Sequence, residues 1–216
     1  MSTPIVIAID GPSASGKSTN AKIIANELGY TYVDTGAMYR TLAWNCLQQG
    51  IDTSNPEAVA HHCETWNAAL AHEDNQVRLR VDGYYPEAEI RSAETSAVVS
   101  AVAAVPFVRD WMKARQRDCV QFGNLVMEGR DIGSNIFPET PYKFYLDASP
   151  AARQQRRDDD GIQENLATRD QRDSTRKSAP LVIPDGATVI NNTGETPEQT
   201  SGRIVAEFNR LKSAGP

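Results

Sequence analysis

The chain has 216 residues, of which 40% are hydrophobic and 23% charged, values that are ordinary for a globular protein with one sizeable core. Its net charge of −6 argues against a dedicated nucleic-acid binder, because such proteins rely on basic side chains to neutralise phosphates. Without an apolar run of roughly 20 residues, and with three widely spaced cysteines, the chain is expected to be cytoplasmic and to bind no membrane.

The N-terminal part of the chain alternates short apolar runs with helical patterns. Residues 4–10 form an apolar run typical of a buried parallel strand. Apolar residues then recur at helical spacing over 21–28, a second short strand is predicted at 31–34, and another helical pattern over 38–47 ends before Gly50. This order of elements is typical of an α/β fold.

Residues 51–92 interrupt the alternation. Apolar positions over 59–70 predict a helix, and residues 75–81 alternate with the period of a strand. The Asp-Gly pair at 82–83 indicates a hairpin turn, after which residues 88–91 are expected to return as a strand. We interpret this segment as a small inserted subdomain.

The C-terminal half returns to alternating strands and helices. Two helical faces lie on either side of Pro106, and three more strands are predicted at 124–131, 142–148 and 187–191. Residues 197–212 form a closing helical pattern. Alternating strands and helices predict a doubly wound, three-layer α/β fold with a central five-stranded parallel sheet.

A phosphate-binding motif follows the first strand. Residues 11–18 read GPSASGKS, which matches GxxxxGK[ST] between a strand and a helix. The glycines let backbone N–H groups face a phosphate, and the helix N-terminus adds positive potential. Lys17 can reach the β- and γ-phosphates, and the Ser18 hydroxyl can bind Mg²⁺. The residues expected at the triphosphate are Gly11, Pro12, Ser13, Ala14, Ser15, Gly16, Lys17, Ser18 and Thr19.

The motif alone leaves several classes of protein open. A regulatory GTPase would need NKxD and a DxxG motif after the third strand, where this chain reads EGRDIG. A motor ATPase would show a hydrophobic run ending in Asp-Glu in a longer chain. A hydroxyl-directed kinase of the shikimate type would carry a second aspartate where this chain has Gly36. A non-catalytic nucleotide-binding module is the remaining alternative, and the intact Lys17 argues against it.

The arginines favour a small kinase whose acceptor is itself a phosphate. A hydroxyl acceptor needs a general base, whereas an anionic phosphate needs cations that bring two polyanions together. Arg40, Arg109 and Arg130 lie near the ends of predicted elements, and residues 153–177 hold seven cationic groups against six acidic ones. We therefore expect a lid over residues 153–176 that brings arginines over the phosphates and excludes water.

Five stretches together resemble the bacterial cytidylate kinase family. They are IAIDGPSASGKST, DTGAMYR, EIRS, EGRDIG and RDQRDSTR followed by APL, and they occur in the family's order from about Ile5 to Leu181. The resemblance implies transfer of the γ-phosphoryl group of ATP to CMP or dCMP by in-line displacement with Mg²⁺ and without a general base. It also implies that the substrates are free nucleotides, and we expect a monomer.

The resemblance also assigns residues. Arg40, Arg130 and Arg176 would hold the acceptor phosphate, with Tyr39 beside it, and Arg169 and Asp173 would hold the ribose. Cytosine offers an N4 amino donor and O2 and N3 acceptors, and the residues around it would be Thr35, Ser100, Arg109 and Asp131. Arg153 and Arg157 would reach the phosphates of ATP. The groups closest to the chemistry would be Lys17, Arg130, Asp131 and Arg176.

The same resemblance divides the chain. A single domain over 1–216 would have its core at 1–50, 93–152 and 177–216, a monophosphate-binding insert at 51–92 and the lid at 153–176. The lid is shorter than that of the family by roughly three helical turns. Glu128 stands where many members have an aspartate near the metal, so Ser18 is the one direct protein ligand of Mg²⁺ that we predict.

Overall fold

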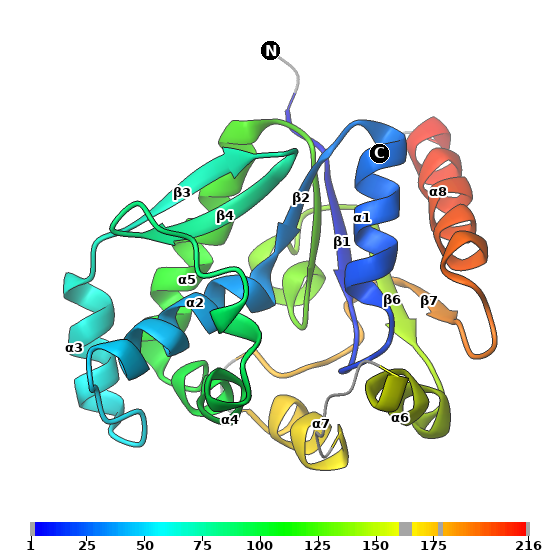
Figure 1. Ribbon diagram of the computed structural model, residues 1–216. Coiled ribbons are helices and arrows are strands. Elements are labelled where there is room, and N and C mark those ends of the chain that lie inside the picture. Colours follow the sequence, from blue (N-terminus) through cyan, green and yellow to red (C-terminus); the bar gives the residue numbers. More distant parts are fainter. Residues whose placement is uncertain (1–2, 160–165, 177–178, 215–216) are drawn as a thin grey trace. The chain divides into compact units, whose positions relative to one another are not determined.

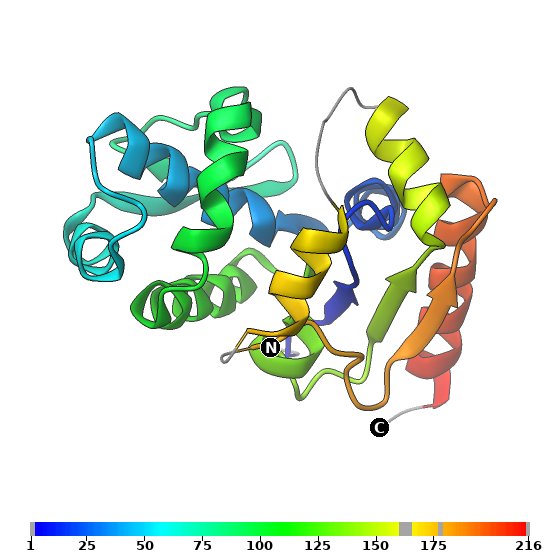
Figure 2. The same cartoon turned by 90° about the horizontal axis from the view of Figure 1, so that it is seen from below.

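The computed structural model of the protein describes residues 3–159, 166–176 and 179–214. The chain forms two compact units, of which the first comprises Met1–Tyr32 and Phe122–Pro216 and the second Val33–Gln121. Figures 1 and 2 show the elements of each unit. Residues 160–165 of the expected lid lie outside the described residues.

The first unit is built on a parallel sheet. Its strands are β1 (Val6–Asp10), β5 (Leu125–Gly129), β6 (Lys143–Asp147), β7 (Thr188–Asn191) and the first half of β2 (Thr31–Asp34), which continues into the second unit. They follow the order β2-β5-β1-β6-β7, and parallel pairing joins β1 to β5 and to β6, and β6 to β7. The parallel α/β fold predicted from the sequence is therefore confirmed. All five residues of β1 and of β5 are buried, which explains why these strands read as continuous apolar runs.

Two helices cover one face of this sheet. α1 (Lys17–Leu28) and α8 (Pro197–Ala214) lie side by side in Figure 1. α1 ends because Gly29 adopts a left-handed conformation and its N–H bonds back to the carbonyls of Ala25 and Asn26. The buried core between helices and sheet contains Ile7, Ile9, Ala21, Ile24, Ala25, Val126, Phe144, Leu146, Ile190, Ile204 and Phe208.

Two short helices represent the expected lid. α6 (Pro150–Asp159) and α7 (Leu166–Ser174) both carry a high proportion of charged residues. Between β5 and β6 the chain makes a single π-helical turn, Ile132–Ile136, in which the N–H of Ile136 bonds to the carbonyl of Asp131 at 3.1 Å. Such turns commonly occur at functional sites.

The second unit combines helices with a hairpin. Its helices are α2 (Thr35–Gln48), α3 (Pro56–Thr65), α4 (Ala93–Val102) and α5 (Pro106–Asp118), and its hairpin strands are β3 (Ala68–Glu73) and β4 (Gln76–Val81). Asp34, Asn55 and Ser92 cap the N-termini of α2, α3 and α4 with their side chains. The hairpin strands are additional to the five parallel strands that we expected.

The second unit confirms one turn of the sequence prediction and corrects three details. Asp82 and Gly83, which were predicted to form a hairpin turn, are both left-handed, and Val81 and Tyr84 on either side of them exchange two backbone hydrogen bonds in an antiparallel bridge. The hairpin of β3 and β4 has its own turn at Asp74 and Asn75, with φ angles of 48° and 60°, which was not predicted. Residues 88–91 contain a 3₁₀ helix, Glu89–Arg91, in place of a strand. The Thr95 hydroxyl donates to the carbonyl of Glu89 and Arg40 donates to the carbonyl of Ile90, so these carbonyls are not available for strand pairing. The helix expected over 59–70 ends at Thr65, and Leu70 lies in β3.

The three cysteines, Cys46, Cys63 and Cys119, are free and buried, as predicted. Burial raises the pKa of Cys46 to about 11 and that of Cys119 to about 12, so these thiols are poor nucleophiles at neutral pH. Among the described residues, no helix is both long and apolar enough to cross a membrane.

Gly11 is the residue on which the packing of the first turn after β1 depends. A β-carbon at Gly11 would lie 2.1 Å from the backbone oxygen of Leu146, whereas one at Gly29 would meet nothing within 4 Å. Both residues have positive φ angles. We expect Gly29→Ala to lower the free energy of unfolding by about 1 kcal/mol, and Gly11→Ala to lower it by at least roughly 3 kcal/mol or to prevent folding. Urea denaturation of both variants checks this, and equal losses would contradict it.

Candidate active site

The phosphate loop connects β1 to α1 and depends on left-handed backbone at three positions. The φ angles are 152° at Gly11, 58° at Ala14 and 87° at Gly16, which precedes the first residue of α1. Ser13 and Ser15 are buried, whereas Ser18 and Thr19 are exposed on the first turn of the helix. The local structure is thus the strand, loop and helix N-terminus that the motif predicted, and it is suited to binding an anion.

Lys17 belongs to the loop as well as to α1. Its side chain is 5% exposed, and Nζ donates to the carbonyl of Pro12 at 2.7 Å and lies 3.4 Å from Oγ of Ser15. The Lys17 side chain therefore extends from the first turn of α1 to the beginning of the loop at Pro12. This position suits a cation that acts on phosphates held by the same loop.

The two arginines predicted to reach the phosphates of ATP both contact the loop. Nη1 of Arg153 donates to the carbonyl of Ser13 at 3.1 Å, and Nη2 of Arg157 donates to Oγ of Ser13 at 2.9 Å. Arg153 is buried and forms an ion pair of 2.5 Å with Asp170 of α7. The structure thus brings these arginines to the loop, and their contact with nucleotide stays a prediction.

Three residues at the loop were not identified from the sequence. Asp170 accepts the N–H of Ser13 at 3.3 Å, Arg156 donates to the carbonyl of Ala14 at 3.1 Å, and Asn192 donates to the carbonyl of Ser15 at 2.9 Å. The spacing of Arg153, Arg156 and Arg157 places all three close together on α6, a signal that could have identified Arg156. Asp170 and Asn192 carry no such signal, because their position depends on the tertiary fold.

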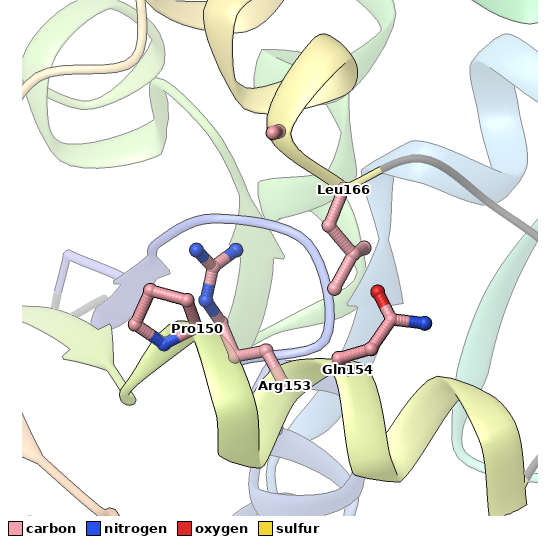
Figure 3. A pocket seen from close by; sticks show the side chains of 5 residues that line it. Pro150, Arg153, Gln154 and Leu166 are labelled. Atoms are coloured by element: carbon pink, nitrogen blue, oxygen red, sulfur yellow. The ribbon is translucent and has the colours of Figure 1, made fainter.

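A pocket of about 500 Å³ lies between α6 and α7. Its lining comprises Pro150, Arg153, Gln154, Leu166 and Ala167. Figure 3 shows the side chain of Leu166 pointing toward Arg153 and Gln154. Proline, leucine, alanine and the aliphatic part of arginine suit the packing of two helices better than the binding of a phosphate.

Asp10, the last residue of β1, fixes the turn that follows Asp131. The fully buried Asp10 carboxylate accepts the N–H groups of Ile132 at 2.8 Å and Gly133 at 2.7 Å. Burial raises its pKa to about 6, and the nearby charge of Asp131 adds to this, while the two backbone hydrogen bonds and Lys17 oppose it. Asp131 is buried as well and accepts a hydrogen bond of 2.9 Å from Nδ2 of Asn135.

Two of the predicted phosphate-binding arginines share one carboxylate. Nε of Arg130 donates to Oδ2 of Asp173 at 2.8 Å, and Arg176 pairs with Oδ1 of the same residue. The Asp173 side chain is buried, whereas the two arginines remain half-buried. The structure thus brings Arg130, Asp173 and Arg176 together, as the acceptor prediction requires. The side chain of Arg169, the other residue expected at the ribose, lies outside the described residues.

The remaining candidate residues belong to the second unit. Nη1 of Arg40 donates to the Ser96 hydroxyl at 2.8 Å and to the carbonyl of Ile90 at 3.2 Å. The buried Arg109 guanidinium lies 5.7 Å from the centre of the Tyr39 ring, a cation–π distance. Within this unit, Tyr39 and Arg109 are therefore neighbours. Thr35 is buried at the start of α2 and Ser100 is half-buried on α4.

The residues of the first unit fit the magnesium ion that the family implies. Mg²⁺ usually takes one or two protein ligands, with waters and substrate phosphates filling its other positions. Ser18 presents an exposed hydroxyl next to Lys17, which is a donor set of this kind. Glu128 is buried and accepts a hydrogen bond of 3.0 Å from the Tyr32 hydroxyl, in keeping with an indirect role. No cluster of three or more His, Cys, Asp or Glu side chains suited to a metal ion occurs within the described part of the chain.

Residues 7–210 match the family model described as cytidylate kinase. The chain belongs to the cytidylate kinase family. It is 39% identical to the cytidylate kinase of Clostridioides difficile (strain 630), with 95% of this chain and 98% of the relative covered. It is 40% identical to that of Geobacillus thermodenitrificans (strain NG80-2), with 97% and 98% covered.

Similarity to a solved structure shows the fold alone. An uncharacterized protein from Eubacterium ventriosum superposes with a TM-score of 0.50 at 13% identity, covering 95% of this chain and 98% of that one. The family assignment therefore depends on the family model and the sequence relatives, which match almost the whole length of the chain.

The raised pKa of Asp10 predicts a pH dependence of stability. An acid whose pKa rises on folding, here from 3.8 to about 6, favours the folded state while it is protonated. This contribution is fully present below pH 4 and is lost as the pH rises through 6. The difference in unfolding free energy between wild type and Asp10→Asn should therefore fall by about 2 kcal/mol between pH 4 and pH 7. Urea denaturation across this range measures the difference, and a constant difference would refute the prediction.

Proposed function

We propose that the protein catalyses the transfer of the γ-phosphoryl group of ATP to CMP or dCMP, giving ADP and the corresponding diphosphate. The observation that carries this proposal is the match of residues 7–210 to the cytidylate kinase family. The geometry of the phosphate loop and the arginine pair around Asp173 support it, because each suits a phosphate group.

On the donor side, the loop N–H groups and the N-terminus of α1 bind the triphosphate. Lys17 neutralises charge on the β- and γ-phosphates, and Arg153 and Arg157, which reach Ser13, add positive potential at the same loop. Mg²⁺, when bound, neutralises the phosphate oxygens, and Ser18 is the residue that would hold it.

On the acceptor side, Arg130, Arg176 and Arg40 hold the phosphate of CMP. Asp173 orients the first two by accepting one hydrogen bond from each on separate oxygens, and the planar guanidinium of arginine suits bidentate contact with a phosphate. The attacking phosphate oxygen is already anionic, so the reaction needs no general base. Asp173, together with Arg169, contacts the ribose hydroxyls, for which a carboxylate is a suitable acceptor.

The base is recognised by hydrogen-bond complementarity. Asp131 accepts the N4 amino group of cytosine, Arg109 donates to O2 and N3, and Thr35 and Ser100 complete the pocket. Tyr39, which lies beside Arg109, packs near the acceptor phosphate. Uracil carries a carbonyl oxygen at C4, which would face the Asp131 carboxylate without a proton between them, so UMP should be a poor substrate.

The domain division expected from the sequence remains part of the proposal. The insert at 51–92 falls within the second unit, Val33–Gln121, and would contribute to binding of the monophosphate, while α6 and α7 would form the lid. The net charge and the buried free cysteines support an enzyme that acts on free nucleotides in the cytoplasm. Its monomeric state stays a prediction.

A coupled assay with ATP and a panel of acceptors tests the reaction itself. CMP and dCMP should be phosphorylated with the highest kcat/KM, ahead of UMP, AMP and shikimate, because only cytosine satisfies both Asp131 and Arg109. Lys17→Met serves as the control for background ATP hydrolysis and should lose at least about a hundredfold in kcat. Lack of preference for the cytidine monophosphates would sink the proposal.

Substitution of Asp131 tests whether its carboxylate recognises the N4 amino group of cytosine. Asp131→Ala should lower the ratio of kcat/KM for CMP over UMP by at least about tenfold, because the discrimination rests on an unpaired polar group. Asp131→Asn should lower it further, since an amide N–H can donate to the uracil oxygen. Both variants need a circular dichroism check of folding, because Asp131 is buried. An unchanged ratio in folded variants would show that another residue reads the base.

A further inference from the structure

Ala14 holds an unusual position in the phosphate loop. Its φ angle is 58°, a left-handed conformation that a β-carbon disfavours and that glycine adopts freely. Such a conformation persists only where surrounding contacts determine it. The question is which contacts hold the peptide groups of Ala14 and Ser15 in this arrangement.

Arg156 of α6 supplies the first of these contacts. Its Nη1 donates to the carbonyl of Ala14 at 3.1 Å, and Nη2 donates to the backbone oxygen and to Oδ1 of Asn192, each at 3.2 Å. The two ends of the guanidinium thus join the loop to the segment after β7. A lysine could not make both contacts, because its single ammonium group lacks the fixed fork of arginine.

Asn192 supplies the second contact. It is 2% exposed, its N–H bonds to the carbonyl of Asp147 at the end of β6 at 2.9 Å, and its Nδ2 donates to the carbonyl of Ser15 at 2.9 Å. The side chain is therefore anchored to the sheet and reaches the loop from a fixed point. Arg156 and Asn192 together hold the carbonyls of two consecutive loop residues.

Arg156 differs from its neighbour Arg153 in the charge of its hydrogen-bond partners. Arg153 is paired with the carboxylate of Asp170, whereas the hydrogen-bond partners that the described structure gives Arg156 are neutral oxygens. Burial lowers the pKa of Arg156, but a guanidinium stays protonated at neutral pH. Its charge consequently adds positive potential beside a loop that receives polyanions.

We propose that Arg156 and Asn192 are positioning residues, which hold Ala14 and Ser15 in the conformation that binds the nucleoside triphosphate and act through the loop backbone. The proposal rests on the proposed function only in that a nucleoside triphosphate binds this loop. It does not depend on the identity of the acceptor. It adds to the family motif a pair of residues that lie outside the motif in the sequence.

The decisive experiment combines Arg156→Lys with Ala14→Gly. In titration calorimetry with MgATP and without an acceptor, Arg156→Lys should raise the Kd by about tenfold, which corresponds to roughly 1.4 kcal/mol. Ala14→Gly alone should change it by less than about twofold. The double variant should recover most of the lost affinity, because glycine adopts the left-handed conformation without help from Arg156.

Two further readouts separate positioning from general damage. In steady-state assays with CMP, Arg156→Lys should raise the KM for ATP while the KM for the acceptor and the melting temperature stay close to wild type. Asn192→Ala, which removes the contact with Ser15, should reproduce the effect and keeps the test open if Arg156→Lys fails to fold. Arg210→Lys, in an exposed pair with Glu207 on α8, is the matched control and should leave every value unchanged.

Two outcomes would overturn the proposal. An unchanged Kd for MgATP in both Arg156→Lys and Asn192→Ala would show that the loop keeps its conformation without them. Additive effects of Arg156→Lys and Ala14→Gly, with no recovery in the double variant, would show that Arg156 acts on the nucleotide directly. Failure of the proposed reaction would appear separately, as MgATP binding without phosphorylation of CMP.

Discussion

An anion-binding loop must aim consecutive N–H groups at one point, and this turns the carbonyl groups of the same peptides toward the protein, where they need donors. The carbonyls of Pro12, Ser13, Ala14 and Ser15 each accept a hydrogen bond from a cationic or amide side chain. These donors come from α1, α6 and the segment after β7. The geometry of the loop therefore depends on the folding of the whole first unit.

The same constraint explains why carboxylates accompany the arginines of the first unit. Closely spaced guanidinium groups repel one another, and a buried carboxylate between them offsets this repulsion and fixes their direction. Asp173 has this relation to Arg130 and Arg176, and the half-buried Asp170 pairs with Arg153. A carboxylate that binds two arginines fixes both guanidinium groups at one place, an arrangement that suits an anionic ligand.

The parts of the fold that local patterns determine could be predicted from the sequence. The strands of the first unit and the loop follow from apolar runs and from the glycines and lysine of one motif. The turn at Asp82–Gly83 could be predicted from its two residues, whereas the turn at Asp74–Asn75 was missed because it becomes evident only from the pairing of β3 with β4. Asp170 and Asn192 were missed because their contacts with the loop cross more than 150 residues of sequence.

The hydrogen bond from Arg156 gives a physical reason for an alanine, rather than a glycine, at position 14. Glycine would adopt the left-handed conformation without strain, but it would also give the unbound loop many more conformations to lose when a triphosphate binds. Alanine restricts these alternatives, and the hydrogen bond from Arg156 offsets the strain at its backbone. Because Arg156 lies on α6 near Arg153, which pairs with Asp170 of α7, the conformation of the loop is linked to the position of α6 against α7. A change that displaces α6 should therefore weaken nucleotide binding even where every residue of the motif is intact.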